Sequence, residues 1–92
     1  MATILQTKTA AAPIRVALVI EEGRIRPVWF EACGNRASDR IFVHTICQTW
    51  THMDGAVRIL NFAVWDGANS YRLSLNTRDF TWSLGIAVES PL

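Results

Sequence analysis

Residues 57–75 read VRILNFAVWDGANSYRLSL, two strand-like runs separated by a four-residue turn. Asp66, Gly67 and Asn69 supply the turn, because these residue types accept the backbone angles of tight connections. Residues 70–76 alternate between apolar and polar side chains, which predicts a strand with one buried face. Residues 57–65 are apolar on both faces and therefore predict a central strand, or one whose second face meets a partner.

The same period of two extends outward from this hairpin in both directions, and no segment shows a capped 3.6-residue period. Glu22-Gly23 and Asp54-Gly55 have the composition of hairpin turns. Pro27 has no N–H to donate, so we expect its strand to lie at a sheet edge or to be bulged there. The six predicted strands are residues 14–21, 24–31, 40–52, 57–65, 70–76 and 80–88.

Short connections make successive strands antiparallel neighbours. A six-stranded sheet of this size must hide its edges, which curling achieves. We therefore expect an all-β, six-stranded antiparallel meander that curls into a small SH3-like barrel, or else a strongly curved sheet. The domain spans residues 14–89 and follows an N-terminal tail, residues 1–13, that is either disordered or a short edge strand. The loop over residues 32–39 leaves the order of the first strands open.

Composition narrows the class of protein. Half of the 92 residues are apolar, which suits one folded domain rather than two. Nine basic and eight acidic residues give a net charge of +1, without the basic surplus of a dedicated duplex DNA binder. The longest apolar stretch, residues 14–20, is far short of the roughly 20 residues that a membrane span needs. No signal-peptide pattern is visible, so we expect a cytoplasmic protein.

The side chains that could carry chemistry are scattered. His44 and His52 lie eight residues apart on one predicted strand, a separation of roughly 26 Å, so they cannot share a metal within one chain. Neither histidine shares a strand face with Cys47. Cys33 and Cys47 form no CxxC motif and are expected to be small buried residues, with a disulfide across a hairpin as the alternative. The aspartates sit at turns, where they cap the backbone. We expect no catalytic site, no metal site and no cofactor.

The nine aromatic rings include one tryptophan on each of four predicted strands, and most of them must fill the core. Trp29 and Phe30 are adjacent and face opposite sides, which leaves one of them outside the sheet. Arg24 and Arg26 share the strand parity of Phe30, and an aromatic–arginine face can stack bases or hold a peptide. The candidate binding surface comprises Arg24, Arg26, Trp29, Phe30, Trp65 and Arg72.

A resemblance covers residues 24–86. The chain resembles a group of small uncharacterised bacterial all-β proteins that share the pattern P-x-x-F … W … F-x-V … D-G … Y-x-L … W-x-L. The segments that carry it are Pro27-Val28-Trp29-Phe30, Trp50, Asn61-Phe62-Ala63-Val64, Asp66-Gly67, Tyr71-Arg72-Leu73 and Trp82-Ser83-Leu84. These are core and turn positions, so the resemblance implies a fold and carries no function. Residues 31–39 depart from that group, which has a tighter turn there.

These features together predict a non-enzymatic protein-interaction module. We expect it to bind another protein or to self-associate as a homodimer, through the apolar strands 57–65 and 24–31. The alternative is weak single-stranded nucleic-acid binding through an exposed aromatic–arginine face, as in other small barrels. A small molecule in the barrel mouth is a third possibility, for which the sequence names no ligand.

Overall fold

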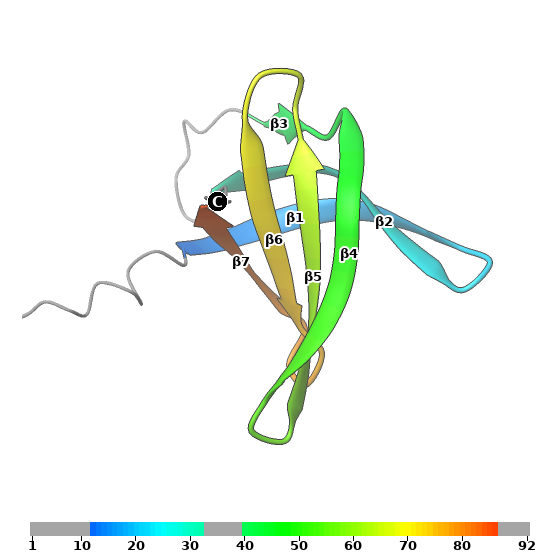
Figure 1. The fold of residues 1–92 in the computed structure, drawn as a ribbon, viewed down its shortest axis with the longest axis vertical. Helices are drawn as coiled ribbons and strands as arrows, with labels where there is room; N and C mark the ends of the chain where they lie inside the picture. The colour runs from blue at the N-terminus through cyan, green and yellow to red at the C-terminus, as the bar shows by residue number, and fades with distance from the viewer. Residues whose placement is uncertain (1–11, 33–39, 87–92) are drawn as a thin grey trace, which may run out of the picture.

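Within the described part of the chain, seven antiparallel strands form one continuous sheet (Figure 1). The structure, a computed structural model, describes residues 12–32 and 40–86. The order across the sheet is β3-β2-β1-β7-β6-β5-β4, which confirms the predicted all-β class with one more strand than expected. The strands are β1 (Ala12–Glu21), β2 (Arg24–Ala32), β3 (Ile41–Phe42), β4 (Thr45–Asp54), β5 (Val57–Trp65), β6 (Ser70–Asn76) and β7 (Thr81–Ile86).

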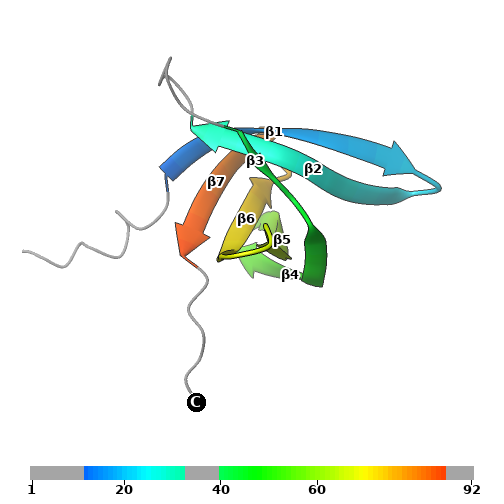
Figure 2. The same cartoon turned by 90° about the horizontal axis from the view of Figure 1, so that it is seen from above.

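The sheet curls into a half-barrel. Seen from above, β1, β2 and β3 form one layer, and β7, β6, β5 and β4 curl beneath it (Figure 2). Ile14 pairs with Trp82, so the first and last described strands lie side by side. The two ends of the sheet meet at one corner: Val43 N–H donates to Val28 O at 2.9 Å, and His44 N–H donates to Trp65 O at 2.7 Å. These two bonds tie β2 to β5 through the segment between β3 and β4.

This corner explains why the strand predicted over residues 40–52 is two strands. Val43 bonds to one layer and His44 to the other, so the chain must bend between them. At the other end of the molecule, Phe80 is 73% exposed in a turn rather than in a strand, with a φ of 58°. The predicted tail ends earlier than expected, because β1 begins at Ala12. Residues 1–11, 33–39 and 87–92 lie outside the described residues, as does most of the predicted 32–39 loop.

A β-bulge follows Pro27, as the sequence predicted. Leu18 pairs with Pro27 while Ala17 pairs with Trp29, which leaves Val28 as the extra residue. The extra residue moves every side chain before it to the opposite face of the strand. Arg24 and Arg26 therefore share the outer face with Trp29. The predicted parity with Phe30 was wrong, because it assumed an unbroken alternation through Val28.

The core fills the inner face of the half-barrel. Phe30 from β2 meets Tyr71 from β6 edge to face, with ring centroids 5.2 Å apart, and so connects the two layers. Phe62 lies beside Trp82 at 5.9 Å. β5 pairs with both β4 and β6, so it is an interior strand of the sheet, next to the edge strand β4. Among the described residues, the core of buried apolar side chains comprises Ile14, Phe30, Phe62, Val64, Leu73 and Leu75, and Pro27 is buried as well.

Candidate functional site

A groove of about 660 Å³ lies between the tip of the β1–β2 hairpin and strands β4 and β5. β2 and β4 diverge beyond the corner at residues 43–44 (Figure 2), and the residues that line the groove come from both sides of this opening. We call this opening between β2 and β4 the seam. The residues that line the groove are Glu21, Glu22, Gly23, Arg24, Ile25, Arg26, Ile46, Thr49, Leu60 and Phe62.

The lining divides by strand face. Ile25, Ile46, Leu60 and Phe62 come from the inner faces of their strands and continue the core outward, because three of them pack partly buried against it and Phe62 belongs to it. The charged residues come from the hairpin tip, two acids and two arginines, and Arg26 Nη2 lies 3.7 Å from Glu21 Oε1. The groove is therefore apolar along its floor and neutral overall at its rim.

Two strand edges border the seam. Among the described residues, β4 pairs only with β5, so its opposite edge has no strand partner. In the described part of the chain, β2 pairs with β1 on one side and with β3 only at Trp29 and Phe30 on the other, which leaves residues 24–27 with a free edge. A strand edge with unpaired N–H and C=O groups can receive another strand.

The two edges differ in how they discourage such pairing. Charged residues and proline blunt sheet edges, and β2 places Arg24, Arg26 and Pro27 on its free edge. β4 has a single bulge at Cys47, where its register with β5 shifts. Beyond it, residues 48–54 contain no proline, lysine or arginine, and the one acidic residue is Asp54 at the strand end. The β4 edge is thus the open one.

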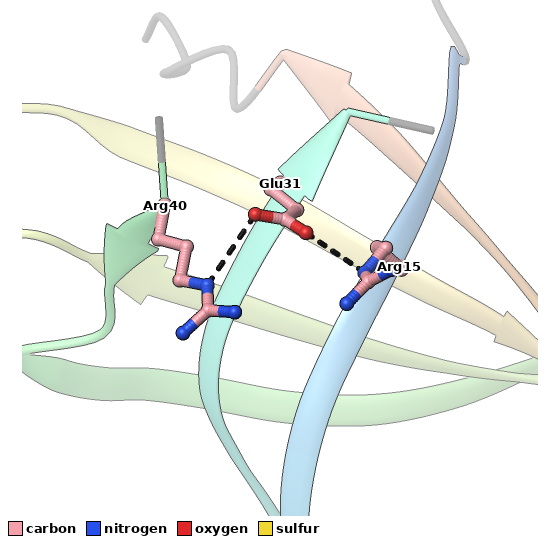
Figure 3. Close-up of polar contacts among 3 residues, drawn as sticks. All are labelled: Arg15, Glu31 and Arg40. Atoms are coloured by element: carbon pink, nitrogen blue, oxygen red, sulfur yellow. Dashed lines mark ion pairs between the residues drawn. The ribbon is translucent and has the colours of Figure 1, made fainter. Parts of the chain in front are cut away.

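A different set of side chains gathers on the outer face of β2. The Arg40 guanidinium lies 4.0 Å from the Trp29 ring centroid, and Arg40 Nε lies 3.4 Å from Glu31. Arg15 Nε lies 2.8 Å from the other oxygen of Glu31, so one carboxylate joins two arginines (Figure 3). Phe42, opposite Trp29 on β3, is 60% exposed. Sequence reasoning missed Arg40, because its contact with Trp29 joins residues on either side of the segment 33–39.

The six predicted surface residues do not come together. Phe30 is 1% exposed and belongs to the core, so its place on the predicted surface was wrong. Trp65 is 38% exposed and meets His44 edge to face at 5.3 Å. Arg72 lies across Gly85, since a Cβ added there would come within 2.5 Å of Arg72 Nη2.

The remaining three, Arg24, Arg26 and Trp29, lie on the outer face of β2, in the layer opposite β5 and β6 (Figure 2). The predicted set is therefore divided among the β2 layer, the core and the β5–β6 layer. Of its members, only Arg24 and Arg26 line the groove.

A hydrogen-bond network centred on the buried Asn61 crosses three strands on the outer face. Asn61 of β5, 1% exposed, donates from Nδ2 to His52 Nδ1 of β4 at 2.8 Å. Ser74 Oγ of β6 donates to Asn61 Oδ1, also at 2.8 Å. Since the Ser74 hydroxyl is directed to the amide and not to the imidazole, the arrangement pairs no nucleophile with a base.

Asp66 and Asp79 cap turns, as predicted, and Asp39 lies outside the described residues. Asp66 accepts bonds from the backbone N–H groups of Asn69 and Ala68, at 2.6 and 2.8 Å, and these bonds hold the pKa of its carboxyl below the ordinary value. Asp79 caps the next turn by accepting from the N–H and hydroxyl of Thr81. In the part of the chain that the structure describes, no three histidine, cysteine or acidic side chains are grouped so that they could hold a metal ion.

The chain matches no family model, and no curated protein or solved structure matches it significantly. The resemblance to the group of small bacterial all-β proteins therefore stays a prediction. Among residues 12–32 and 40–86 no helix is long and apolar enough to cross a membrane.

Proposed function

We propose that the protein is a non-enzymatic protein-interaction module that receives an extended polypeptide segment as an added strand on the edge of β4. The observation that carries this proposal is the juxtaposition in the seam of an unprotected strand edge with an apolar groove. Ile46 and Thr49 belong to both features, since they lie on β4 and line the groove. An occupant of the seam would use both together.

Strand addition divides recognition into two parts. Main-chain hydrogen bonds to the β4 edge supply affinity that is independent of sequence, and pockets for alternate side chains supply specificity. Every second side chain of the added segment points inward, because strand side chains alternate. Leu60 and Phe62 lie on that inner side, which favours apolar residues at those positions. The neutral rim adds no charge preference.

The proposed binding edge lies on β4, and not on the strand 57–65 that the sequence indicated as an interaction surface. β5 lies between β4 and β6, so both of its edges are used within the sheet. Its inner residues Leu60, Phe62 and Val64 belong to the core or pack against it, whereas Trp65 on the outer face is 38% exposed. For the second predicted strand, β2, only residues 24–27 retain a free edge, and that edge carries two arginines and a proline.

A cytoplasmic location is part of the proposal. Cys47 is exposed at the bulge of β4, so its expected burial was wrong, and Cys33 lies outside the described residues. Exposed thiols persist in reducing compartments and oxidise outside them. Fractionation of cells that express the full chain would test this point, and recovery in a membrane or secreted fraction would contradict it.

Selection from a phage-displayed library of proline-free twelve-residue peptides tests the proposed function. We expect selected peptides to alternate apolar and polar residues and to bind the full chain in calorimetric titrations. Thr49→Lys places a charge at the groove and on the edge, and should weaken binding about tenfold or more. Ser70→Lys, at an exposed position on the interior strand β6, is the matched control and should bind as the unmodified chain does.

Thermal unfolding of both lysine variants verifies that they fold. Failure of a chain that is monomeric in sedimentation to select any peptide, or equal binding by Thr49→Lys, would overturn the proposal. Poly-dT at low salt provides a third arm of the experiment, followed by tryptophan fluorescence. Fluorescence quenching by poly-dT, together with no peptide binding, would replace the proposal with the single-stranded nucleic-acid alternative.

A further inference from the structure

We infer that the strand added to β4 is β4 of a second copy of this chain, in an antiparallel pair about a two-fold axis. This inference rests on the proposed function and names its partner. A two-fold pair uses the same surface on both chains, so that surface must be complementary to itself. Charge, side-chain alternation and exposed apolar area on β4 each meet that requirement.

Charge is the first of these. Residues 48–54 read QTWTHMD, and the only acidic residue is at the end of the segment. Antiparallel pairing places the two Asp54 side chains at opposite ends of the interface, so no like charges face each other. The net charge of +1 adds little repulsion between copies. A strongly charged partner, by contrast, would find no complementary charge on this edge.

Side-chain alternation is the second property that makes the β4 edge complementary to itself. Beyond the bulge, Thr49 and Thr51 pair with the inner residues Phe62 and Leu60, while Trp50 pairs with Asn61 on the outer side. A two-fold axis through Thr51 pairs Thr49 of one copy with Met53 of the other, and therefore sets inner side chains against inner side chains. The paired sheets then continue each other without exchanging faces, which register requires.

Exposed apolar area is the third. Met53 lies on the inner side near the tip of the β4–β5 hairpin, where it is 56% exposed. In the antiparallel pair it lies near Thr49 of the other copy and extends the apolar groove floor across the interface. Trp50, half-buried in one copy, can add a cross-strand aromatic contact near the axis. These contacts give the second copy more than backbone hydrogen bonds.

Sedimentation equilibrium of the full chain tests this inference. We expect a monomer–dimer equilibrium in which the dimer fraction rises from micromolar to millimolar concentration, as befits a small interface. Thr51→Lys places two lysines beside the axis and should abolish the dimer, while Ser70→Lys should leave it unchanged. Thermal unfolding again verifies that both variants fold.

Spin labels locate the interface. In a Cys33→Ser, Cys47→Ser background, a nitroxide on Thr51→Cys should show dipolar broadening at high concentration, because paired strands lie about 5 Å apart. The same label on Ser70→Cys should show none.

A strict monomer, or a dimer that Thr51→Lys leaves intact, would overturn the inference. If the strict monomer still binds selected peptides in a Thr49-dependent manner, only the second-copy assignment fails. If the chain neither dimerises nor binds peptides, the proposed function fails with it.

Discussion

At the residue scale, the amide of Asn61 lies on the outer face of the sheet and is nevertheless buried, at 1% exposed. It satisfies its amide by bonding to His52 and Ser74, one on each neighbouring strand. A buried polar group with partners costs little, whereas one without them costs its full desolvation. The network therefore favours the register that joins β4, β5 and β6, since a slip of one residue would separate the three side chains.

Asn61→Ala removes these bonds, and we expect it to lower the free energy of unfolding by about 1–3 kcal/mol in urea denaturation. His52→Ala should cost less, because His52 is exposed and its lost bond can be replaced by water. The double variant should reveal a coupling of about 0.5–1.5 kcal/mol between the two positions. Strictly additive losses would show that the Asn61–His52 bond does not stabilise the fold.

The contribution of Asp66 to the stability of the fold should depend on pH. Bonds from Asn69 and Ala68, and a weaker one from the Tyr71 hydroxyl at 3.2 Å, lower the pKa of its carboxyl in the folded state. The ionised form is thus favoured by folding, so its stabilisation is present at neutral pH. It is lost as the pH falls from the unfolded-state pKa through the lower folded-state pKa.

We expect Asp66→Asn to be less stable than the unmodified chain at neutral pH and to lose less stability on acidification. Urea denaturation at a series of pH values would show the two stability curves converging in acid. Parallel curves across the acid range would contradict the role of the Asp66 charge.

Individual side chains differ in how well sequence predicts them. The Asp-Gly-Ala-Asn segment identifies Asp66 as a turn cap, because a cap and its partners lie within three residues. Asn61 finds its partners nine and thirteen residues away, and only the strand register brings them together. No local pattern could have identified that network. The stacking of Arg40 on Trp29 is non-local in the same way.

At the element scale, the bulge at Val28 sets which face each residue of β2 presents. Pro27 indicated that the strand would be irregular, but not which residue would be extra. The alternation therefore placed Arg24 and Arg26 with Phe30 instead of with Trp29. A bulge changes parity without changing composition, so it is visible only in the pairing of two strands.

Deletion of Val28 would remove the extra residue and turn the arginines of β2 toward the inner face. We expect this deletion to lower the free energy of unfolding by at least about 3 kcal/mol, because charged groups would enter an apolar surface. Val28→Ala, which keeps the register, should cost only about 1–2 kcal/mol. Similar losses for the two variants in chemical denaturation would argue against this role of the bulge.

The corner at residues 43–44 also depends on contacts between strands and not on the local sequence. Residues 41–50 have a continuous strand composition, so local propensity gives no reason to break them. The break arises because Val43 bonds to β2 and His44 to β5. The hydrogen bonds that close the sheet thus override the local preference of residues 41–50 for one continuous strand.

At the scale of the whole molecule, the curled antiparallel sheet follows from period-two segments joined by short turns. The position of the opening between β2 and β4 does not follow from these local features. It depends on the pairing of β1 with β7 and on two hydrogen bonds at the corner, all contacts between distant parts of the chain. The candidate site inherits this dependence, since the groove and the free β4 edge exist only where the half-barrel stays open.

Residue-resolved amide hydrogen exchange along β4 tests the role of the seam most directly. In dilute solution, the N–H groups of residues 48–54 that point away from β5 should exchange rapidly, while their neighbours bonded to β5 are protected. Raising the chain concentration, or adding a selected peptide, should protect those outward N–H groups. Unchanged exchange along β4, with new protection on the Trp29 face or nowhere, would contradict strand addition at the seam.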